Sequence, residues 1–228
     1  ILCVCLAGAG YLYISNKLGK LNYETISKDA NDLGISSENA DKKSEMSKYR
    51  NIALLGLDSR YDTYDEDYRT DCIMIASINQ ETNEVTLYSI YRDTYVEVPE
   101  HGYTKINHAY AYGGATLAMS TINRNLDLNI TEYATINFQV VKDLVDEVGG
   151  VKISVTSAEA TQIPGITKAG TQTLNGEQAL AYGRIRKIDS DYARTERMRT
   201  VLTEVFNKAK KMSVADLNNV LDKVLPEV

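Results

Sequence analysis

The chain has 228 residues, 43% of them apolar, which is enough for one domain with a core of ordinary size. Its formal net charge of −6 argues against a broad nucleic-acid-binding surface, so we expect no nucleic-acid partner. The three cysteines have neither metal-ligand spacing nor an evident disulfide framework, and they do not indicate the compartment.

Residues 1–14 (ILCVCLAGAGYLYI) form an uncharged apolar run. Because the run is shorter than the roughly 20 residues that span a bilayer, we expect residues 1–15 to be the end of one membrane-spanning helix. A signal peptide is the alternative, since residues 7–9 (AGA) resemble a cleavage site. Residues 16–48 are polar and are predicted to be a linker. The globular domain is then residues 49–228, outside the cytoplasmic membrane.

Three short apolar runs open this domain. Residues 51–57 (NIALLGL), 72–79 (CIMIASIN) and 85–90 (VTLYSI) have the length of strands, and the first is typical of a strand buried on both faces. A short polar turn separates the second run from the third. Because short connections favour antiparallel neighbours, we predict a three-stranded meander.

Charged residues gather where the ends of these strands would meet at one edge of the sheet. They are Asp58, Arg60, Arg69, Asp71, Arg92 and Asp93. Any single aspartate at a strand end can be a turn residue. Two neighbouring carboxylates, however, share a proton or hold a cation. With arginines around them, we expect a hard ion such as Mg²⁺ that bridges to a phosphate.

Predicted helices and strands alternate in the second half. The helices are residues 115–126 and 139–148, and the strands are residues 133–138 and 151–155. This alternation indicates an α/β fold with a mixed sheet covered by helices. Asn175 is expected near the N-cap of the next helix, and a final helix is expected at about Val214–Val224.

Residues 174–199 (LNGEQALAYGRIRKIDSDYARTERMR) hold six basic residues in an otherwise acidic chain. Most charge runs are solvated helix faces. Here the apolar residues that follow repeat at helical spacing: Met198, Val201, Leu202, Val205 and Phe206. Arg194 and Arg197 continue that stripe and should face the protein, where a charge needs a partner or a polar cleft. Arg184 and Arg186, two residues apart, point to one side of an extended chain. Since guanidinium groups bind phosphate bidentately, we predict an anion site.

Several motifs together resemble the LytR-CpsA-Psr family of bacterial cell-wall enzymes over about residues 49–211. In order, they are NIALLGLDSR, RTD, SIYRDTYVEVP, KINHAYAYGG, LNGEQALAYGRIR and DYARTERMR. The resemblance implies a mixed sheet sandwiched between helices and one N-terminal membrane helix. It also implies transfer of a glycopolymer, such as wall teichoic acid or capsular polysaccharide, from a polyprenyl diphosphate carrier to peptidoglycan.

The resemblance also implies roles for individual residues. Asp58 and Asp71 would serve Mg²⁺. The diphosphate would be held by Arg69, Arg92, Arg184, Arg186 and Arg194, to which the inward helix face adds Arg197. Arg92, Asp93, Arg184 and Arg186 are the predicted catalytic residues, with Asp93 as one candidate to accept the proton of the acceptor hydroxyl. Several positions depart from the family pattern: Tyr91 replaces a usual proline, Met198 a common glutamine and Ala193 a common glycine, and the tract between GRIR and DYAR is about two residues shorter than is typical.

A lipid carrier requires an apolar tunnel, which the predicted helices 115–126 and 139–148 could line, although their apolar residues are equally explained as core. Two rival functions use the same site. With water as the acceptor it would be a polyprenyl-diphosphate phosphatase, and without chemistry it would be a binding module for lipid-linked polymer. Transcriptional regulation is disfavoured because an acidic domain outside the membrane has no helix-turn-helix signature.

Overall fold

The computed structural model describes residues 26–27, 29–41, 43–57, 69–186, 188 and 190–227. Its strands are β1 (Tyr49–Leu57), β2 (Thr70–Asn79), β3 (Val85–Ile90), β4 (Tyr95–Val98), β5 (Gly102–Lys105), β6 (Glu132–Ile136), β7 (Val151–Val155) and β8 (Gly170–Leu174). Its α-helices are α2 (Ser37–Ala40), α3 (His108–Leu126), α4 (Phe138–Glu147), α5 (Ser157–Ala160), α6 (Gly176–Gly183), α7 (Asp191–Ala209) and α8 (Val214–Val224). Two 3₁₀ helices are η1 (Glu45–Lys48) and η2 (Leu225–Glu227).

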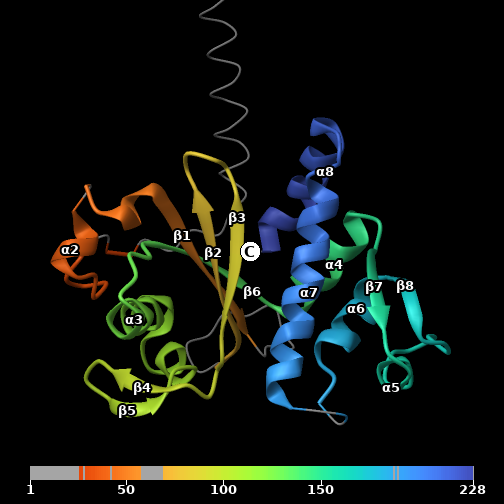
Figure 1. Cartoon of the computed structure of the whole chain (residues 1–228), viewed down its shortest axis with the longest axis horizontal. Coiled ribbons are helices and arrows are strands. Elements are labelled where there is room, and N and C mark those ends of the chain that lie inside the picture. The colour runs from red at the N-terminus through yellow and green to blue at the C-terminus, as the bar shows by residue number, and fades with distance from the viewer. Residues whose placement is uncertain are drawn as a thin grey trace, which may run out of the picture.

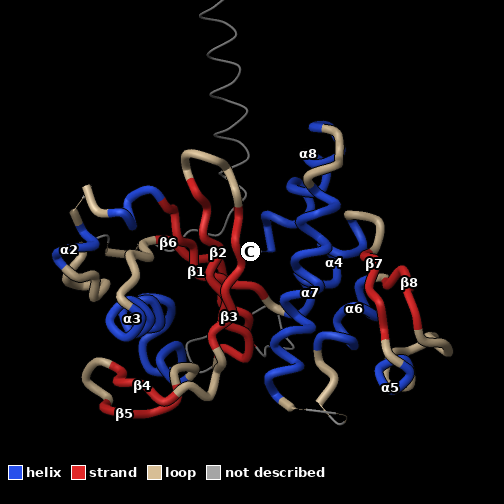
Figure 2. Tube along the Cα trace, in the orientation of Figure 1, coloured by secondary structure: helices blue, strands red, loops and turns tan. Residues whose placement is uncertain are grey.

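A four-stranded sheet in the order β3-β2-β1-β6 forms the centre of the molecule (Figure 2). β2 is antiparallel to both β1 and β3, so the predicted meander is confirmed. β6 joins β1 in parallel, which makes the sheet mixed. The register pairs Ile73 with Ile90, so the start of β2 lies beside the end of β3.

Helices cover both faces of this sheet (Figure 1). Helix α3 lies on one side, and α4, α6, α7 and α8 lie on the other. Residues of β1 alternate between two apolar cores: Leu55 packs toward α3, and Leu54 packs toward α4 and α7. This alternation is the period of a strand buried on both faces. The predicted α/β fold, a mixed sheet sandwiched between helices, is therefore confirmed.

One predicted strand lies elsewhere than expected. β7 has the predicted bounds Val151–Val155, but it pairs with β8 in a separate two-stranded sheet and does not join the central one. Its side chains alternate between buried and exposed, and both Lys152 and Ser154 are exposed. A strand with one polar face suits a hairpin at the surface, whereas a strand between two helical layers needs two apolar faces.

The folded part begins earlier than the predicted boundary at residue 49. Leu33 is completely buried and Ile35 is 9% exposed, and both pack into the core on the α3 side. Asn123 of α3 also donates a hydrogen bond to the Leu33 carbonyl oxygen at 2.9 Å. The chain before β1 therefore contributes to the domain, which corrects the linker prediction for its last residues.

The predicted membrane helix, residues 1–15, lies outside the described residues. Within the part of the chain that the structure describes, no helix is both long and apolar enough to cross a membrane.

Candidate functional site

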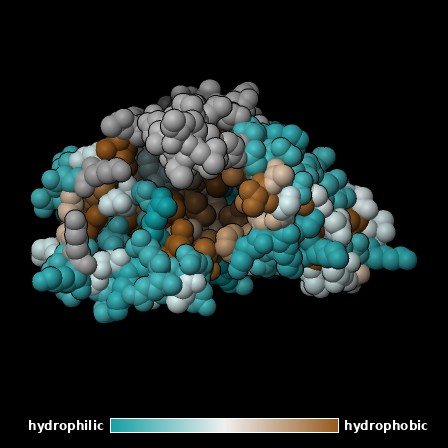
Figure 3. Space-filling view, turned by 90° about the horizontal axis from the view of Figure 1, so that it is seen from above, coloured by the Kyte–Doolittle hydropathy of each residue, from teal (hydrophilic) through white to brown (hydrophobic). Residues whose placement is uncertain are grey.

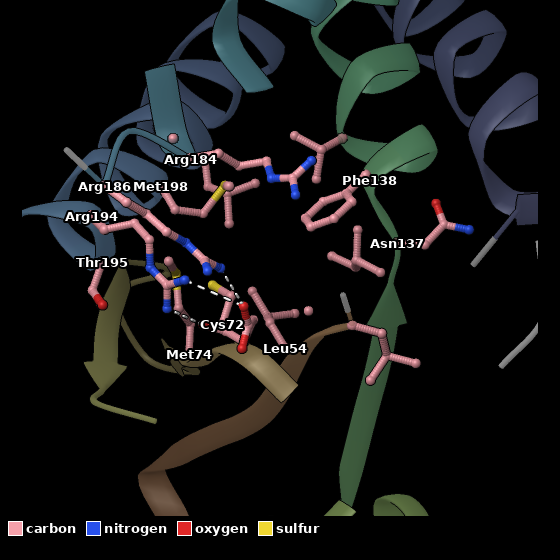
Figure 4. Close-up of a pocket in the computed structure, with 17 residues that line it drawn as sticks. Leu54, Cys72, Met74, Asn137, Phe138, Arg184, Arg186, Arg194, Thr195 and Met198 are labelled. Carbon is pink, nitrogen blue, oxygen red and sulfur yellow. Dashed lines mark hydrogen bonds and ion pairs between the residues drawn. The ribbon is translucent and has the colours of Figure 1, made fainter. Parts of the chain in front are cut away.

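Three arginines contact the carboxylate of Asp71, and two of them, Arg186 and Arg194, are labelled in Figure 4. Arg92 Nη1 lies 2.8 Å from Oδ1, and Arg186 Nη2 lies 2.9 Å from Oδ2. Arg194 Nη1 lies 3.3 Å from Oδ2, and its Nη2 donates to the backbone carbonyl oxygen of Asp71 at 3.2 Å. The Asp71 side chain is 17% exposed. Three guanidinium groups around one carboxylate leave a net positive charge in a partly desolvated place.

These residues come from four parts of the chain. Asp71 is the second residue of β2, and Arg92 follows the end of β3, so the antiparallel pairing of these strands brings the two together. Arg186 lies between α6 and α7, and Arg194 lies in the first turn of α7. Ser190 caps α7 by accepting a hydrogen bond from the backbone nitrogen of Ala193. This cap fixes where α7 begins, and with it the position of Arg194 along the helix.

The structure keeps Asp71 ionised. Burial acts to raise the pKa of Asp71, but the hydrogen bond and charge of Arg92, with the charges of Arg194 and Arg186, outweigh it and lower that pKa below its usual range. The neighbouring thiol behaves differently, because burial raises the pKa of Cys72 to about 12. Cys72 is therefore a neutral thiol at physiological pH and not a nucleophile.

Arg184 and Asp93 lie beside this cluster with partners of their own. The guanidinium of Arg184 lies over the ring of Phe138, 4.2 Å from its centroid. Asp93 Oδ1 lies 2.7 Å from Lys105 Nζ, and Asp93 Oδ2 lies 3.6 Å from Arg92 Nε. The hydrogen bond from Lys105 lowers the pKa of Asp93. A lowered pKa makes this carboxylate a weaker base, although the carboxylate lies beside Arg92.

Arg197 is buried, as its place on the inward stripe of α7 predicts, but it contacts Glu159 and Ile185 and not the carboxylate of Asp71. Its Nε lies 2.7 Å from Glu159 Oε1, and its Nη1 donates to the carbonyl oxygen of Ile185 at 3.3 Å. Burial acts to raise the pKa of Glu159, but hydrogen bonds from Arg197 and Thr156 outweigh it and lower that pKa. Arg197 thereby holds the segment that carries Arg184 and Arg186.

The sequence gives little indication of Glu159. The spacing of Thr156 and Glu159 is that of a capping box, which the structure confirms at the start of α5. That pattern accounts for the residue as a helix cap and does not identify a partner 38 residues away.

Arg69, another predicted ligand of the diphosphate, is exposed. Burial lowers the pKa of His108, and the positive charge of Arg69 lowers it further.

An apolar cleft opens beside the arginines, between the sheet and the helices α4 and α7. Its apolar lining includes Leu54, Leu57, Met74, Ile136, Phe138, Val141, Met198 and Leu202, and its polar end includes Asp71, Arg184, Arg186 and Arg194. Figure 3 shows apolar side chains around a hollow in the face seen from above. Of the two helices predicted to line a tunnel, α4 contributes Phe138 and Val141 to this cleft, whereas α3 lies on the opposite face of the sheet.

Met198 packs in this cleft against the end of α6. A Cβ built on Gly183 would lie 2.7 Å from Met198 Cε, so the absence of a side chain at Gly183 lets α6 and α7 approach closely. Met198, one of the residues that depart from the family pattern, is thus part of the apolar lining.

The donors at this edge suit a hard cation only in part. The described residues hold no group of three or more His, Cys, Asp or Glu side chains that could bind a metal ion. Asp71 is an ionised carboxylate in a cleft, which is the kind of ligand that Mg²⁺ takes together with water and substrate phosphates. Asp58 and Arg60, which we predict beside it, lie outside the described residues. The roles of all these residues stay predictions.

Known proteins match both the sequence and the fold. The model of the LytR_cpsA_psr family matches residues 10–228. The polyisoprenyl-teichoic acid–peptidoglycan teichoic acid transferase TagT of Bacillus subtilis (strain 168) is 40% identical over 71% of this chain, and the match spans about half of that protein (53%). A second teichoic acid transferase of this kind, TagU of Enterococcus faecalis (strain ATCC 700802 / V583), is 35% identical over 98% of this chain and 73% of its own length.

A solved structure agrees with these matches. The LytR-CPS2A-psr family protein YwtF (TagT), with bound octaprenyl pyrophosphate lipid, has a TM-score of 0.67 and 28% identity. The superposition covers 89% of this chain and 82% of that one. The motifs, the fold and the matched length lead to the same conclusion: this chain belongs to the LytR_cpsA_psr family.

Proposed function

We propose that this chain transfers a glycopolymer from a polyprenyl diphosphate carrier to peptidoglycan. The observation that supports this most is the junction of the arginine cluster with the apolar cleft. A lipid diphosphate is anionic at its head and apolar along its tail, and this site offers guanidinium groups to one part and aliphatic side chains to the other. The teichoic acid transferase activities of the relatives TagT and TagU, and the lipid bound to YwtF, are in keeping with that substrate class.

In the proposed reaction an acceptor hydroxyl of peptidoglycan attacks the phosphorus that bears the sugar. A new phosphorus–oxygen bond forms to the acceptor, the bond to the bridging oxygen breaks, and polyprenyl phosphate leaves. Negative charge increases on the bridging oxygen and on the leaving phosphate. Arg92, Arg186 and Arg194 would stabilise that charge once the diphosphate draws them from Asp71.

Arg184 would contribute a fourth positive charge, and its position over Phe138 restricts where the guanidinium can lie. The proton of the acceptor hydroxyl needs a base. Asp93 lies beside Arg92, but the hydrogen bond from Lys105 weakens this carboxylate as a base. We therefore propose that Asp93 positions Arg92 at least as much as it accepts a proton.

Magnesium is part of this proposal. Asp71 would hold the ion together with Asp58 and oxygens of the diphosphate, and the ion would supply charge neutralisation to the phosphates. The substrate also implies a place for the domain. We propose that it lies outside the cytoplasmic membrane and is anchored by residues 1–15, so that lipid carrier and peptidoglycan are both within reach.

Product analysis tests the reaction class. The full chain would be incubated with Mg²⁺, a polyprenyl-diphosphate-linked saccharide and peptidoglycan fragments, and both products would be followed by mass. We expect a sugar phosphate linked to peptidoglycan and a loss of at least about 100-fold in Arg92→Ala, since removal of one charge-stabilising donor costs about that much. Arg50→Ala is a matched control, because Arg50 lies at the end of β1 away from the site, where it pairs with Glu132 of β6.

Other products would point to another function. Free polyprenyl phosphate without a linked product would show that water is the acceptor and that the chain is a phosphatase. Binding of the lipid without either product, with or without metal, would contradict catalysis and favour a binding module.

A further inference from the structure

Two tyrosines that are close in sequence to arginines of the cluster contact each other through their rings. Tyr91 directly precedes Arg92 at the end of the edge strand β3, and Tyr192 lies two residues before Arg194 at the start of α7. Arg92 and Arg194 both contact the carboxylate of Asp71. The ring pair therefore joins the end of the edge strand β3 to the start of α7, the two segments from which Arg92 and Arg194 reach Asp71.

The geometry of the pair leaves much ring surface in water. The ring centroids lie 4.4 Å apart with an interplanar angle of 80°, so the edge of one ring meets the face of the other. Tyr91 is 40% exposed and Tyr192 is 61% exposed. The contact positions the two rings, and much of the surface of both stays exposed. Exposed aromatic surface is typical of an interaction site.

The position of the rings restricts the chemistry of that ligand. On the proposed function, the group attached to the diphosphate opposite the lipid is a sugar. One face of a pyranose ring carries mainly C–H groups, which pack against an aromatic face, and its edges carry hydroxyl groups. Tyrosine offers both a flat apolar ring and a hydroxyl that exchanges hydrogen bonds, which suits such an amphipathic ligand.

We propose that Tyr91 and Tyr192 form a stacking site for the first sugar of the lipid-linked polymer. The inference rests on the proposed function and adds to it the residues that distinguish a sugar-bearing diphosphate from a bare one. The arginines would bind the diphosphate of either ligand, whereas the tyrosines would contact only the ligand that carries a sugar.

The test compares two probes in a binding assay that needs no acceptor. One is a short-chain polyprenyl diphosphate that carries a single N-acetylhexosamine, and the other is the same lipid diphosphate without sugar. Binding of both to the full chain would be measured by calorimetry in detergent for wild type, Tyr91→Ala, Tyr192→Ala and Tyr103→Ala. Tyr103 is a matched control because it is 65% exposed and stacks on Tyr95 in the separate β4–β5 hairpin.

We expect each of Tyr91→Ala and Tyr192→Ala to weaken binding of the sugar-bearing probe about three- to tenfold, as the loss of one aromatic contact predicts. Binding of the bare lipid diphosphate should stay within about twofold of wild type, and Tyr103→Ala should change neither affinity. Tyr192→Phe should keep most of the affinity, because it keeps the ring.

Two results would overturn the inference and leave the proposed function intact. Equal losses for both probes would mean that the tyrosines only position Arg92 and Arg194. Unchanged affinity for the sugar-bearing probe in both alanine variants would mean that the rings do not touch the sugar. If wild type bound neither probe, the proposed function would fail together with the inference. If sugar-selective losses occurred in a chain that transfers nothing, the stacking site would stand while transfer failed.

Discussion

Removal of one partner of the buried ion pair between Arg197 and Glu159 should destabilise the fold by several kcal/mol. Its atoms are 2.7 Å apart, and the two side chains are 6% and 11% exposed. Removal of one partner from a buried pair costs about 3–5 kcal/mol, because the other charge stays desolvated. Glu159→Gln keeps an amide oxygen that can accept from Arg197, so we expect the lower end, about 3 kcal/mol. For a domain of about 200 residues that lowers Tm by about 6–12 °C.

The assay is thermal unfolding followed by circular dichroism at neutral and acidic pH. The lowered pKa of Glu159 means that its stabilisation is present above the pKa of an unfolded glutamate, about 4.3, and is lost as the pH falls through the lower pKa of the folded state. The gap in Tm between wild type and Glu159→Gln should therefore narrow on acidification below about pH 4.3. Arg197→Met combined with Glu159→Gln should be more stable than the sum of the single changes predicts.

A surface pair provides the control for this stability measurement. Glu147 Oε1 lies 2.7 Å from Nζ of Lys223, whose side chain is 63% exposed, so Glu147→Gln should change stability little compared with Glu159→Gln. If Glu159→Gln lowered Tm no more than Glu147→Gln did, or if its effect did not depend on pH, the buried pair would not stabilise the fold in the way described.

Three further predictions concern ligand binding. Asp71→Asn removes the anion that competes for three arginines, so metal-free affinity for inorganic pyrophosphate should rise about tenfold by calorimetry while Mg²⁺-dependent transfer falls. Phe138→Leu removes the ring under Arg184 and should weaken pyrophosphate binding about three- to tenfold in the same assay. Leu202→Trp should fill the apolar cleft and weaken binding of a polyprenyl diphosphate, with pyrophosphate affinity unchanged.

Each of these predictions has a contrary result. Weaker pyrophosphate binding in Asp71→Asn would show that the carboxylate organises the arginines more than it competes for them. Unchanged binding in Phe138→Leu would mean that the ring does not hold Arg184. Unchanged lipid affinity in Leu202→Trp would place the lipid outside the cleft.

Much of the fold can be predicted from local patterns. The strand Val85–Ile90 and the helix Val214–Val224 have the predicted bounds, and Asn175 caps α6 as expected. These elements carry their own signals: a polar turn on one side, or a capping residue before an apolar stripe. Short connections predict the meander, and the meander in turn predicts that Asp71 lies close to Arg92.

The errors arise where distant parts of the chain decide the outcome. The helical stripe correctly predicts that Arg194 and Arg197 face inward, but periodicity cannot say which partner each one meets. Arg194 meets Asp71, whereas Arg197 meets Glu159 on α5. Phe206, at the end of the same stripe, is 37% exposed, whereas Val201 in the middle of the stripe is completely buried. Leu33 falls within the predicted linker because one apolar residue among polar ones gives no periodic signal.

The proposed function requires the arginines around Asp71 to hold the diphosphate of a lipid whose chain lies between the sheet and helices α4 and α7. A crystal structure of the full chain with a short-chain polyprenyl diphosphate tests this most directly. We expect phosphate oxygens within hydrogen-bond distance of Arg92, Arg186 and Arg194, with the prenyl chain against the apolar lining of the cleft. A diphosphate bound elsewhere, with these arginines still on Asp71, would contradict the proposal.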